Sequence, residues 1–259
     1  MKNPPSTILI TGASRGIGAA LARELAKDDV ELLLVARNAE DLKSLAAELQ
    51  ARGTRCECLP CDLSRPEDVA ALAETVAARP KLDGLIHNAG IGLYGKLESL
   101  READMRELFE INFFSVLTLT RRLLPLLKQS PLPRILLVSS VVSWRAIAGL
   151  GVYCASKFAL NGFAEALRVE VAPHGIKVVN TYPGRTRTNF STAAKSDGWK
   201  PFAVDHRGIS PEKVARKLAR AYRKGKRDEF VSFSNRLLIW ANFCFPRLVD
   251  WGLEKLTQK

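Results

Sequence analysis

The sequence predicts an α/β protein with a doubly wound, mostly parallel sheet, and two observations support this fold class. The first is an alternation of short apolar runs with longer amphipathic stretches along the 259-residue chain. The second is that the apolar runs are nearly continuous, as expected for strands that are buried on both faces of a sheet. Such alternation is typical of strand–helix–strand units, so we expect helices on both faces.

The expected strands are the apolar runs, and the expected helices are the amphipathic stretches between them. The strands fall at residues 8–10, 32–35, 84–86, 135–138 and 177–179. The helices fall at residues 19–27, 39–52, 66–78, 101–128, 152–171 and 211–223. We expect one domain over residues 1–259. Residues 184–208 form the longest irregular segment, and we expect a lid there because long loops in compact domains are often functional.

Composition favours a chain with a sizeable core, since 47% of its residues are hydrophobic. The sequence shows no signal peptide and no apolar run of membrane-spanning length, so we expect a cytoplasmic location. The five cysteines, an odd number, are interpreted as reduced thiols. Cys56, Cys58 and Cys61 have the spacing of a metal cluster, but no fourth ligand lies nearby in the sequence. We expect a strand leading into a loop there, and no metal.

The glycine-rich segment Thr11-Gly12-Ala13-Ser14-Arg15-Gly16-Ile17-Gly18 follows the first expected strand and opens the first expected helix. In that position glycines permit a tight turn and let the backbone approach a pyrophosphate, whose charge faces the helix N-terminus. The spacing differs from that of the commonest dinucleotide fingerprint. A simple glycine-rich turn therefore stays an alternative for this segment taken alone.

The end of the second expected strand distinguishes the two nicotinamide dinucleotides. An acidic residue there would bind the adenosine ribose hydroxyls of NAD, whereas an arginine accommodates the 2′-phosphate of NADP. The chain has Ala36 followed by Arg37, and Arg15 lies in the glycine-rich loop. These residues predict NADP(H), although both arginines could instead be solvated.

Tyr153 and Lys157 are spaced to lie one turn apart on the same face of a helix. The ordinary pKa of a phenol is near 10, and a nearby ammonium lowers it. Tyr153 is therefore a candidate acid or base for a carbonyl/alcohol pair. The serine pair Ser139-Ser140 ends an apolar run just upstream.

These motifs together resemble the short-chain dehydrogenase/reductase family over residues 7–190. By that resemblance, residues 12, 14–18, 37, 62–63, 88–90, 153, 157, 183–184, 186 and 188 bind the cofactor. The residues concerned are Gly12, Ser14, Arg15, Gly16, Ile17, Gly18, Arg37, Asp62, Leu63, Asn88, Ala89, Gly90, Tyr153, Lys157, Pro183, Gly184, Thr186 and Thr188. The family fold is of Rossmann type, with a seven-stranded parallel sheet. Residues 191–259 would form the substrate lid and a variable C-terminal region.

The resemblance also implies the catalytic roles. Tyr153 gives a proton to the carbonyl oxygen, and Ser140, thirteen residues before it, orients the same oxygen. Lys157 holds the nicotinamide ribose and keeps Tyr153 acidic, while Asn112 supports a water that relays protons to Lys157. The basic residues Arg185 and Arg187 depart from the family pattern and leave the substrate side of that loop open.

The net charge of +12 favours anionic partners, and eight basic residues with no acidic one lie between residues 213 and 227. Residues 237–251 are rich in aromatic side chains and too short to span a bilayer. They could lie on a membrane surface, line a lipophilic substrate channel, contact another subunit or pack as a last helix on the sheet. Nucleic-acid binding is not expected, because no recognised module accompanies the basic segment.

The leading hypothesis is an NADPH-dependent reductase of an apolar or lipid-like ketone or aldehyde, acting as a homodimer or homotetramer with peripheral membrane contact. One alternative is an alcohol dehydrogenase working in the oxidative direction. Another is a non-catalytic NADPH-binding regulator, which would have no chemical need for the set formed by Asn112, Ser140, Tyr153 and Lys157.

Overall fold

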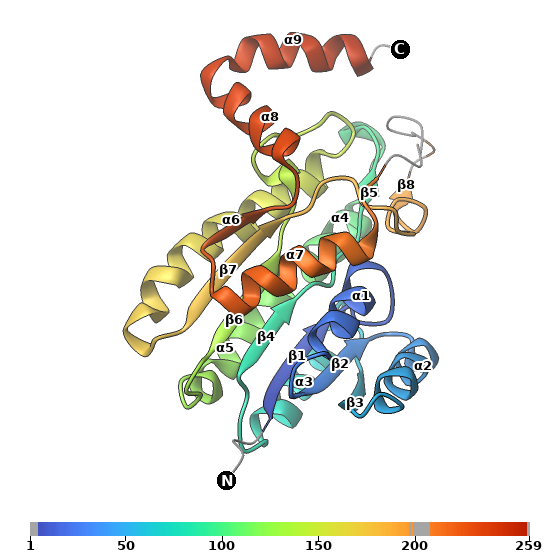
Figure 1. Cartoon of the computed structure of the whole chain (residues 1–259). Helices are drawn as coiled ribbons and strands as arrows, with labels where there is room; N and C mark the ends of the chain where they lie inside the picture. Colours follow the sequence, from blue (N-terminus) through green and yellow to red (C-terminus); the bar gives the residue numbers. More distant parts are fainter. Residues whose placement is uncertain (1–4, 197, 199–207, 258–259) are drawn as a thin grey trace.

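A seven-stranded parallel sheet forms the centre of the computed structural model, which describes residues 5–196, 198 and 208–257 (Figure 1). The strands are β1 (Ser6–Thr11), β2 (Val30–Ala36), β3 (Arg55–Pro60), β4 (Gly84–His87), β6 (Arg134–Val138), β7 (Lys177–Tyr182) and β9 (Asp228–Phe230). Their spatial order is β3-β2-β1-β4-β6-β7-β9, and every neighbouring pair is parallel. The chain reverses its direction of growth between β1 and β4, so the predicted doubly wound, single-domain fold is confirmed.

Strand β2 shows why the apolar runs form the inside of the sheet. Leu32 and Leu34 enter one core cluster, while Leu33 and Val35 enter the other, and all four are fully buried. Alternate side chains of a strand point to opposite faces, so a run without polar residues needs a cover on each face.

Helices supply that cover in two layers (Figure 1). The core cluster on one face includes residues of α1 (Gly16–Leu25), α2 (Ala39–Gln50) and α7 (Pro211–Lys224), and the cluster on the other includes residues of α3 (Pro66–Ala77), α5 (Ser115–Leu127) and α6 (Gly151–Val171). Short connections carry the 3₁₀ turns η1 (Leu97–Ser99), η3 (Val141–Ser143) and η4 (Ala172–His174). The strands β5 (Leu93–Tyr94) and β8 (Lys195–Ser196) pair outside the main sheet.

One predicted helix is divided in the structure. Residues 101–128 were expected to be continuous, but they form α4 (Glu102–Phe109), a π-helical turn η2 (Glu110–Phe114) and then α5. Asn112 lies in the π-helical turn, where its side chain accepts a hydrogen bond from Ile91 N at 2.9 Å and donates to Ile91 O at 3.0 Å. Such turns often occur at functional sites.

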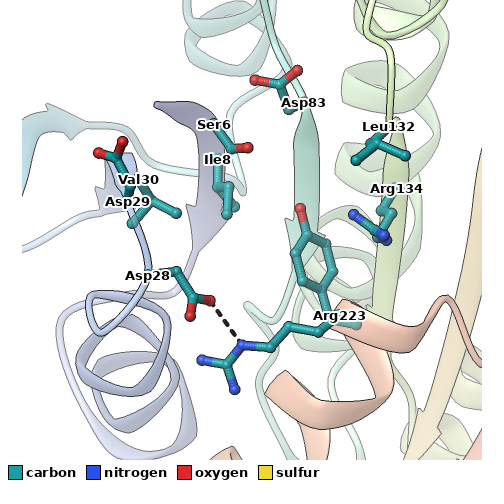
Figure 2. A pocket seen from close by; sticks show the side chains of 10 residues that line it. Ser6, Ile8, Asp28, Asp29, Val30, Asp83, Leu132, Arg134 and Arg223 are labelled. Atoms are coloured by element: carbon teal, nitrogen blue, oxygen red, sulfur yellow. Dashed lines mark hydrogen bonds and ion pairs between the residues drawn. The ribbon is translucent and has the colours of Figure 1, made fainter. Parts of the chain in front are cut away.

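Helix α7 has the amphipathic character that the sequence predicts. The Ser210 hydroxyl accepts a hydrogen bond from Lys213 N and caps its first turn, and the apolar face is buried against α1. At its other end, Arg223 Nε lies 2.7 Å from Asp28 Oδ2. Figure 2 shows this ion pair beside a small cavity of about 150 Å³ at the amino ends of the strands. Asp83 and Arg134 also line this cavity. The ion pair therefore links the end of α7 to the turn before β2, at the edge of the sheet where the strands begin.

The chain ends in two helices, α8 (Phe233–Cys244) and α9 (Pro246–Thr257), which project beyond the sheet in Figure 1. We call these two helices, residues 233–257, the C-terminal arm. Across the described ranges, no helix is both long enough and apolar enough to cross a bilayer.

The clustered cysteines do not converge. Cys56 and Cys58 pack towards one core cluster, whereas Cys61 belongs to the cluster on the opposite face of the sheet. Burial raises the pKa of Cys56 to about 11 and the pKa of Cys61 to about 12. Residues 5–196, 198 and 208–257 contain no group of three or more side chains placed to hold a metal ion.

Candidate active site

Several of the predicted site residues come directly after the carboxyl ends of parallel strands, which places them at one edge of the sheet. The glycine-rich loop follows β1, Asn88 follows β4, Ser140 follows β6 and Pro183 follows β7. This edge on either side of a strand-order reversal is where open α/β sheets bind ligands.

Thr11 and Asn88 join the ends of β1 and β4. The Thr11 hydroxyl oxygen accepts hydrogen bonds from the backbone N–H groups of Asn88 and Ala89, both at 3.1 Å. Asn88 Nδ2 in turn donates to Thr11 O and Gly12 O at 3.0 Å. These bonds fix the path of the glycine-rich loop across the edge of the sheet.

Two glycines of this loop are required by the backbone. Gly12 has a φ of +66°, and a Cβ added there would lie 2.8 Å from Ala89 Cα. At Gly18 an added Cβ would lie 2.0 Å from Gly12 O, so the first turn of α1 packs directly on the loop. The contact leaves no room for a side chain at either position.

The N-terminus of α1 fits a pyrophosphate. Arg15 occupies the N-cap position without making a side-chain cap, and the first turn contains no acidic residue. The first backbone N–H groups of a helix have no partner within the helix, and helix N-termini of this kind bind phosphates in other proteins. Ala13 N donates to Val35 O at 3.0 Å, which brings the loop beside the end of β2.

The end of β2 presents a cation and no acid. Ala36 is buried, while Arg37 is exposed and has no ion pair within the described part of the chain. Asp62, after β3, accepts hydrogen bonds from Ser64 N at 3.0 Å and Ser64 Oγ at 2.8 Å. Burial favours a higher pKa for Asp62, but the Ser64 hydrogen bonds and the charges of Arg37 and Arg65 outweigh it and lower the pKa.

The structure places Ser140, and not Ser139, next to Tyr153. The Ser139 hydroxyl is buried and donates to Asn161 Oδ1 at 3.0 Å. The Ser140 hydroxyl interacts with the Tyr153 phenol and also accepts a hydrogen bond from Val142 N at 3.3 Å. The two hydroxyls can therefore meet the same substrate oxygen.

Lys157 is almost fully buried beside this pair. Its Nζ donates to Val138 O at 3.0 Å and lies 5.9 Å from the centroid of the Tyr153 ring. Burial lowers the pKa of Lys157 to about 8, because the charged form loses solvent. A predominantly protonated ammonium at pH 7 follows from this value.

The pKa of Tyr153 shifts in the direction opposite to the sequence-based prediction. Burial raises it above the ordinary value of a phenol, and the hydrogen bond with Ser140 only partly opposes this. The lowering of the Tyr153 pKa that was expected from the Lys157 charge is not the dominant effect in the protein. Desolvation outweighs the neighbouring charge because the phenolate has little access to water.

Asn112 and Gly90 complete the floor of the site. A Cβ added to Gly90 would lie 3.2 Å from Asn112 Oδ1 and 3.5 Å from Lys157 Nζ, so both groups border the same space. Asn112 Nδ2 also donates to Ser156 Oγ at 3.2 Å, on the helix that carries Lys157.

The loop after β7 contacts two parts of the site. Pro183 O accepts hydrogen bonds from Val141 N at 3.1 Å and Ser140 Oγ at 3.4 Å. The Thr186 hydroxyl donates to Gly184 O at 3.1 Å, and a Cβ added to Gly16 would lie 3.2 Å from Thr188 Cγ2. The loop therefore touches both the serine and the glycine-rich loop. Within the predicted lid, residues 197 and 199–207 lie outside the described residues.

Two features of the site were missed from the sequence. The ring of Phe190 packs on Tyr153 with centroids 5.6 Å apart. An apolar cavity of about 450 Å³ lies beside the N-terminus of α6, and its walls include Leu97, Met105, Ile147 and Val152. Neither Ser140 nor Tyr153 lines it. Both features bring together segments that are distant in the sequence, so no local sequence pattern predicts them.

Comparison with known proteins decides the family. The chain matches the short chain dehydrogenase family over residues 6–199. It belongs to that family. The uncharacterized oxidoreductase YbbO of Escherichia coli K12 is 34% identical over 262 residues, covering 97% of this chain and 94% of its own length. Retinol dehydrogenase 8 of Homo sapiens is 35% identical over 194 residues, covering 73% of this chain and 62% of its own length. The chain is therefore an oxidoreductase of the short-chain family.

Solved structures agree with the fold and with nicotinamide cofactors as its ligands. A short-chain dehydrogenase from Sphingobium yanoikuyae in complex with NADPH has a TM-score of 0.82 and 27% identity, covering 96% of this chain and 95% of its own. A family member from Burkholderia phymatum in complex with NAD has a TM-score of 0.84 over 96% of each chain, at 22% identity, and shows the shared fold. Members of this fold thus bind either dinucleotide.

Proposed function

We propose that the protein is an NADPH-dependent reductase of ketones or aldehydes, with Tyr153 as the proton donor. The observation that supports it most is the meeting of the Ser140 and Tyr153 hydroxyls beside the buried ammonium of Lys157. A carbonyl oxygen placed between the two hydroxyls would accept a hydrogen bond from each. The bound dinucleotide would supply the hydride to the carbonyl carbon.

The protein's own groups account for the proton. The Tyr153 O–H bond breaks as the proton passes to the substrate oxygen, and the charge left on the phenolate lies near the Lys157 ammonium. Proton transfer from a positioned group is worth about 10²–10⁴-fold in rate. Burial raises the pKa of Tyr153, so the phenol is protonated at neutral pH, as a proton donor must be.

The preference for NADPH rests on Arg37. An exposed guanidinium at the end of β2, with no carboxylate at Ala36, suits the 2′-phosphate rather than a free ribose. Arg15 lies on the adjoining loop and would contribute a second cation. The Sphingobium yanoikuyae relative, solved in complex with NADPH, is consistent with this choice.

The preference for an apolar substrate rests on the surroundings of Tyr153. The Phe190 ring covers the phenol, and the cavity next to the N-terminus of α6 is mostly apolar. Retinol dehydrogenase 8 carries in its name a lipophilic alcohol, which is consistent with this chemistry.

NADPH oxidation by the purified protein, with a panel of aliphatic and aromatic ketones and aldehydes, tests the proposal. Turnover of an apolar member, abolished in Tyr153→Phe, is the expected result. NADPH binding without turnover of any carbonyl would favour the non-catalytic regulator instead. Faster oxidation of the matching alcohols with NADP than reduction of the carbonyls would favour the oxidative enzyme.

A further inference from the structure

The C-terminal arm exposes an unusual share of apolar surface. Seven of the twelve large apolar side chains exposed in the described residues belong to residues 233–251. On α8, Phe233, Leu237 and Trp240 recur at the spacing of one helix face, and Leu248 and Trp251 do so on α9. A concentration of exposed apolar side chains in one region is typical of an interaction site.

The arm contacts the segment between Ser140 and Tyr153. The Trp144 ring packs edge-on against Phe243 with centroids 6.0 Å apart. Arg145 Nη2 lies 2.5 Å from Asp250 Oδ1. Trp144 and Arg145 lie between Ser140 and Tyr153, so whatever covers the arm also lies near the substrate side of the site.

The charges around the arm identify the kind of surface that fits it. Arg236 and Arg247 are exposed and have no ion pair within the described ranges, and Lys255 Nζ lies 3.9 Å above the Trp251 ring. Of the arm's acidic side chains, Asp250 pairs with Arg145, and Glu254 also lies on α9. The arm therefore offers cations beside aromatic rings, the arrangement of helices that lie in a membrane interface.

Helix α7, which contacts the chain just before α8, carries further exposed cations. On α7 four exposed cations, Lys213, Arg216, Arg220 and Lys224, recur on one face and make no ion pair in the part of the chain that the structure describes. Lys217 Nζ donates to Val231 O at 2.7 Å, two residues before α8 begins. Anionic lipid would neutralise these cations, whereas a surface of like charge would repel them.

We propose that α8 and α9 dock the protein on the surface of an anionic phospholipid bilayer, with Trp240, Leu248 and Trp251 entering the acyl boundary. The inference goes beyond the proposed reductase activity and does not depend on it. It places the active-site segment at the lipid surface, where apolar carbonyl compounds are concentrated.

Co-sedimentation tests the proposal with phosphatidylcholine vesicles that either contain or lack phosphatidylserine, at low and high salt. We expect binding to the phosphatidylserine vesicles, weakened by salt, and a loss of about tenfold or more in Trp240→Ser/Trp251→Ser. Leu248→Ser should weaken binding, and Leu132→Ser should not. Leu132 is the matched control because both leucines are 64% exposed and Leu132 lies next to the amino end of β6.

Thermal unfolding of each variant, measured alongside, excludes loss of the fold as the cause of a loss of binding. Wild-type protein that binds no vesicle, or a double variant that binds as well as wild type, would overturn the proposal. So would light scattering that shows an oligomer in the wild type and a monomer in Trp240→Ser/Trp251→Ser without any vesicle binding, since a second copy would then cover the arm.

Discussion

Lys157 and Tyr153 face each other across one turn of α6, with the ammonium nitrogen 5.9 Å from the centroid of the phenol ring. The ammonium is held by Val138 O at the end of β6 and has no carboxylate partner in the described residues. Its charge is therefore not cancelled locally. The pair combines a phenol that stays protonated with a cation that would stabilise the phenolate once the proton has left.

Tyr153→Phe should remove the proton donor and leave the shape of the site intact. We expect the rate of carbonyl reduction to fall by about 10²–10⁴-fold while the NADPH dissociation constant changes little. Steady-state kinetics and a cofactor titration measure the two quantities. A variant within a few-fold of the wild-type rate would exclude Tyr153 as the acid.

Lys157 should make stability depend on pH in a defined window. Its pKa is about 8 in the folded protein and 10.5 ordinarily, so the unfolded chain binds more protons between these values. The free energy of unfolding of wild type, relative to Lys157→Met, should therefore rise with pH from about 8 to 10.5, by about 3 kcal/mol at most.

Urea unfolding of both proteins across that range measures the difference, in which the groups they share cancel. A difference that does not change with pH would show that the ammonium is better solvated than its 4% exposure indicates.

Arg37→Asp should exchange a phosphate partner for a ribose partner. We expect weaker NADPH binding, by about tenfold or more, and tighter NADH binding. Arg220→Asp is the matched control, since Arg220 is also an exposed arginine without an ion pair in the described chain but lies on α7. Titration of each variant with both cofactors gives the four constants. Tighter binding of NADH than of NADPH by the unmodified protein would contradict the preference at once.

Local patterns in the sequence predicted most of the sheet and the pairing of Tyr153 with Lys157, whereas the rest of the candidate site followed from the family resemblance. The strand β2 is recognisable because it is apolar throughout, and Tyr153 and Lys157 because their spacing matches a helical turn. Strand β9 was missed because Asp228 and Glu229 give it no apolar run; its place is set by pairing with β7.

The remaining differences come from tertiary contacts. The π-helical turn at Asn112 depends on the backbone of Ile91, a strand-end partner that the pattern of residues 101–128 does not reveal. The pKa of Tyr153 was predicted in the wrong direction because burial could not be weighed without the packing of Phe190 and Ser140 around the ring. The predicted homodimer or homotetramer stays a prediction.

Gly18→Ala tests whether the contact between the glycine-rich loop and α1 is as tight as the geometry indicates. The new Cβ would lie 2.0 Å from Gly12 O and 2.5 Å from Asn88 Nδ2, so the loop or the helix must shift. Overpacking of this kind costs about 1–3 kcal/mol, and the displaced loop should also bind NADPH less tightly.

Gly162→Ala is the matched control, because Gly162 lies within α6 and an added Cβ there meets nothing within 4 Å. That variant should be more stable than wild type by about 0.5–1 kcal/mol, since alanine costs less backbone entropy in a helix. Urea unfolding and NADPH titration of the two variants separate steric strain from a general glycine effect. Equal stability changes in both would mean that the loop yields to the methyl group, and the tight contact would then not explain why residue 18 is a glycine.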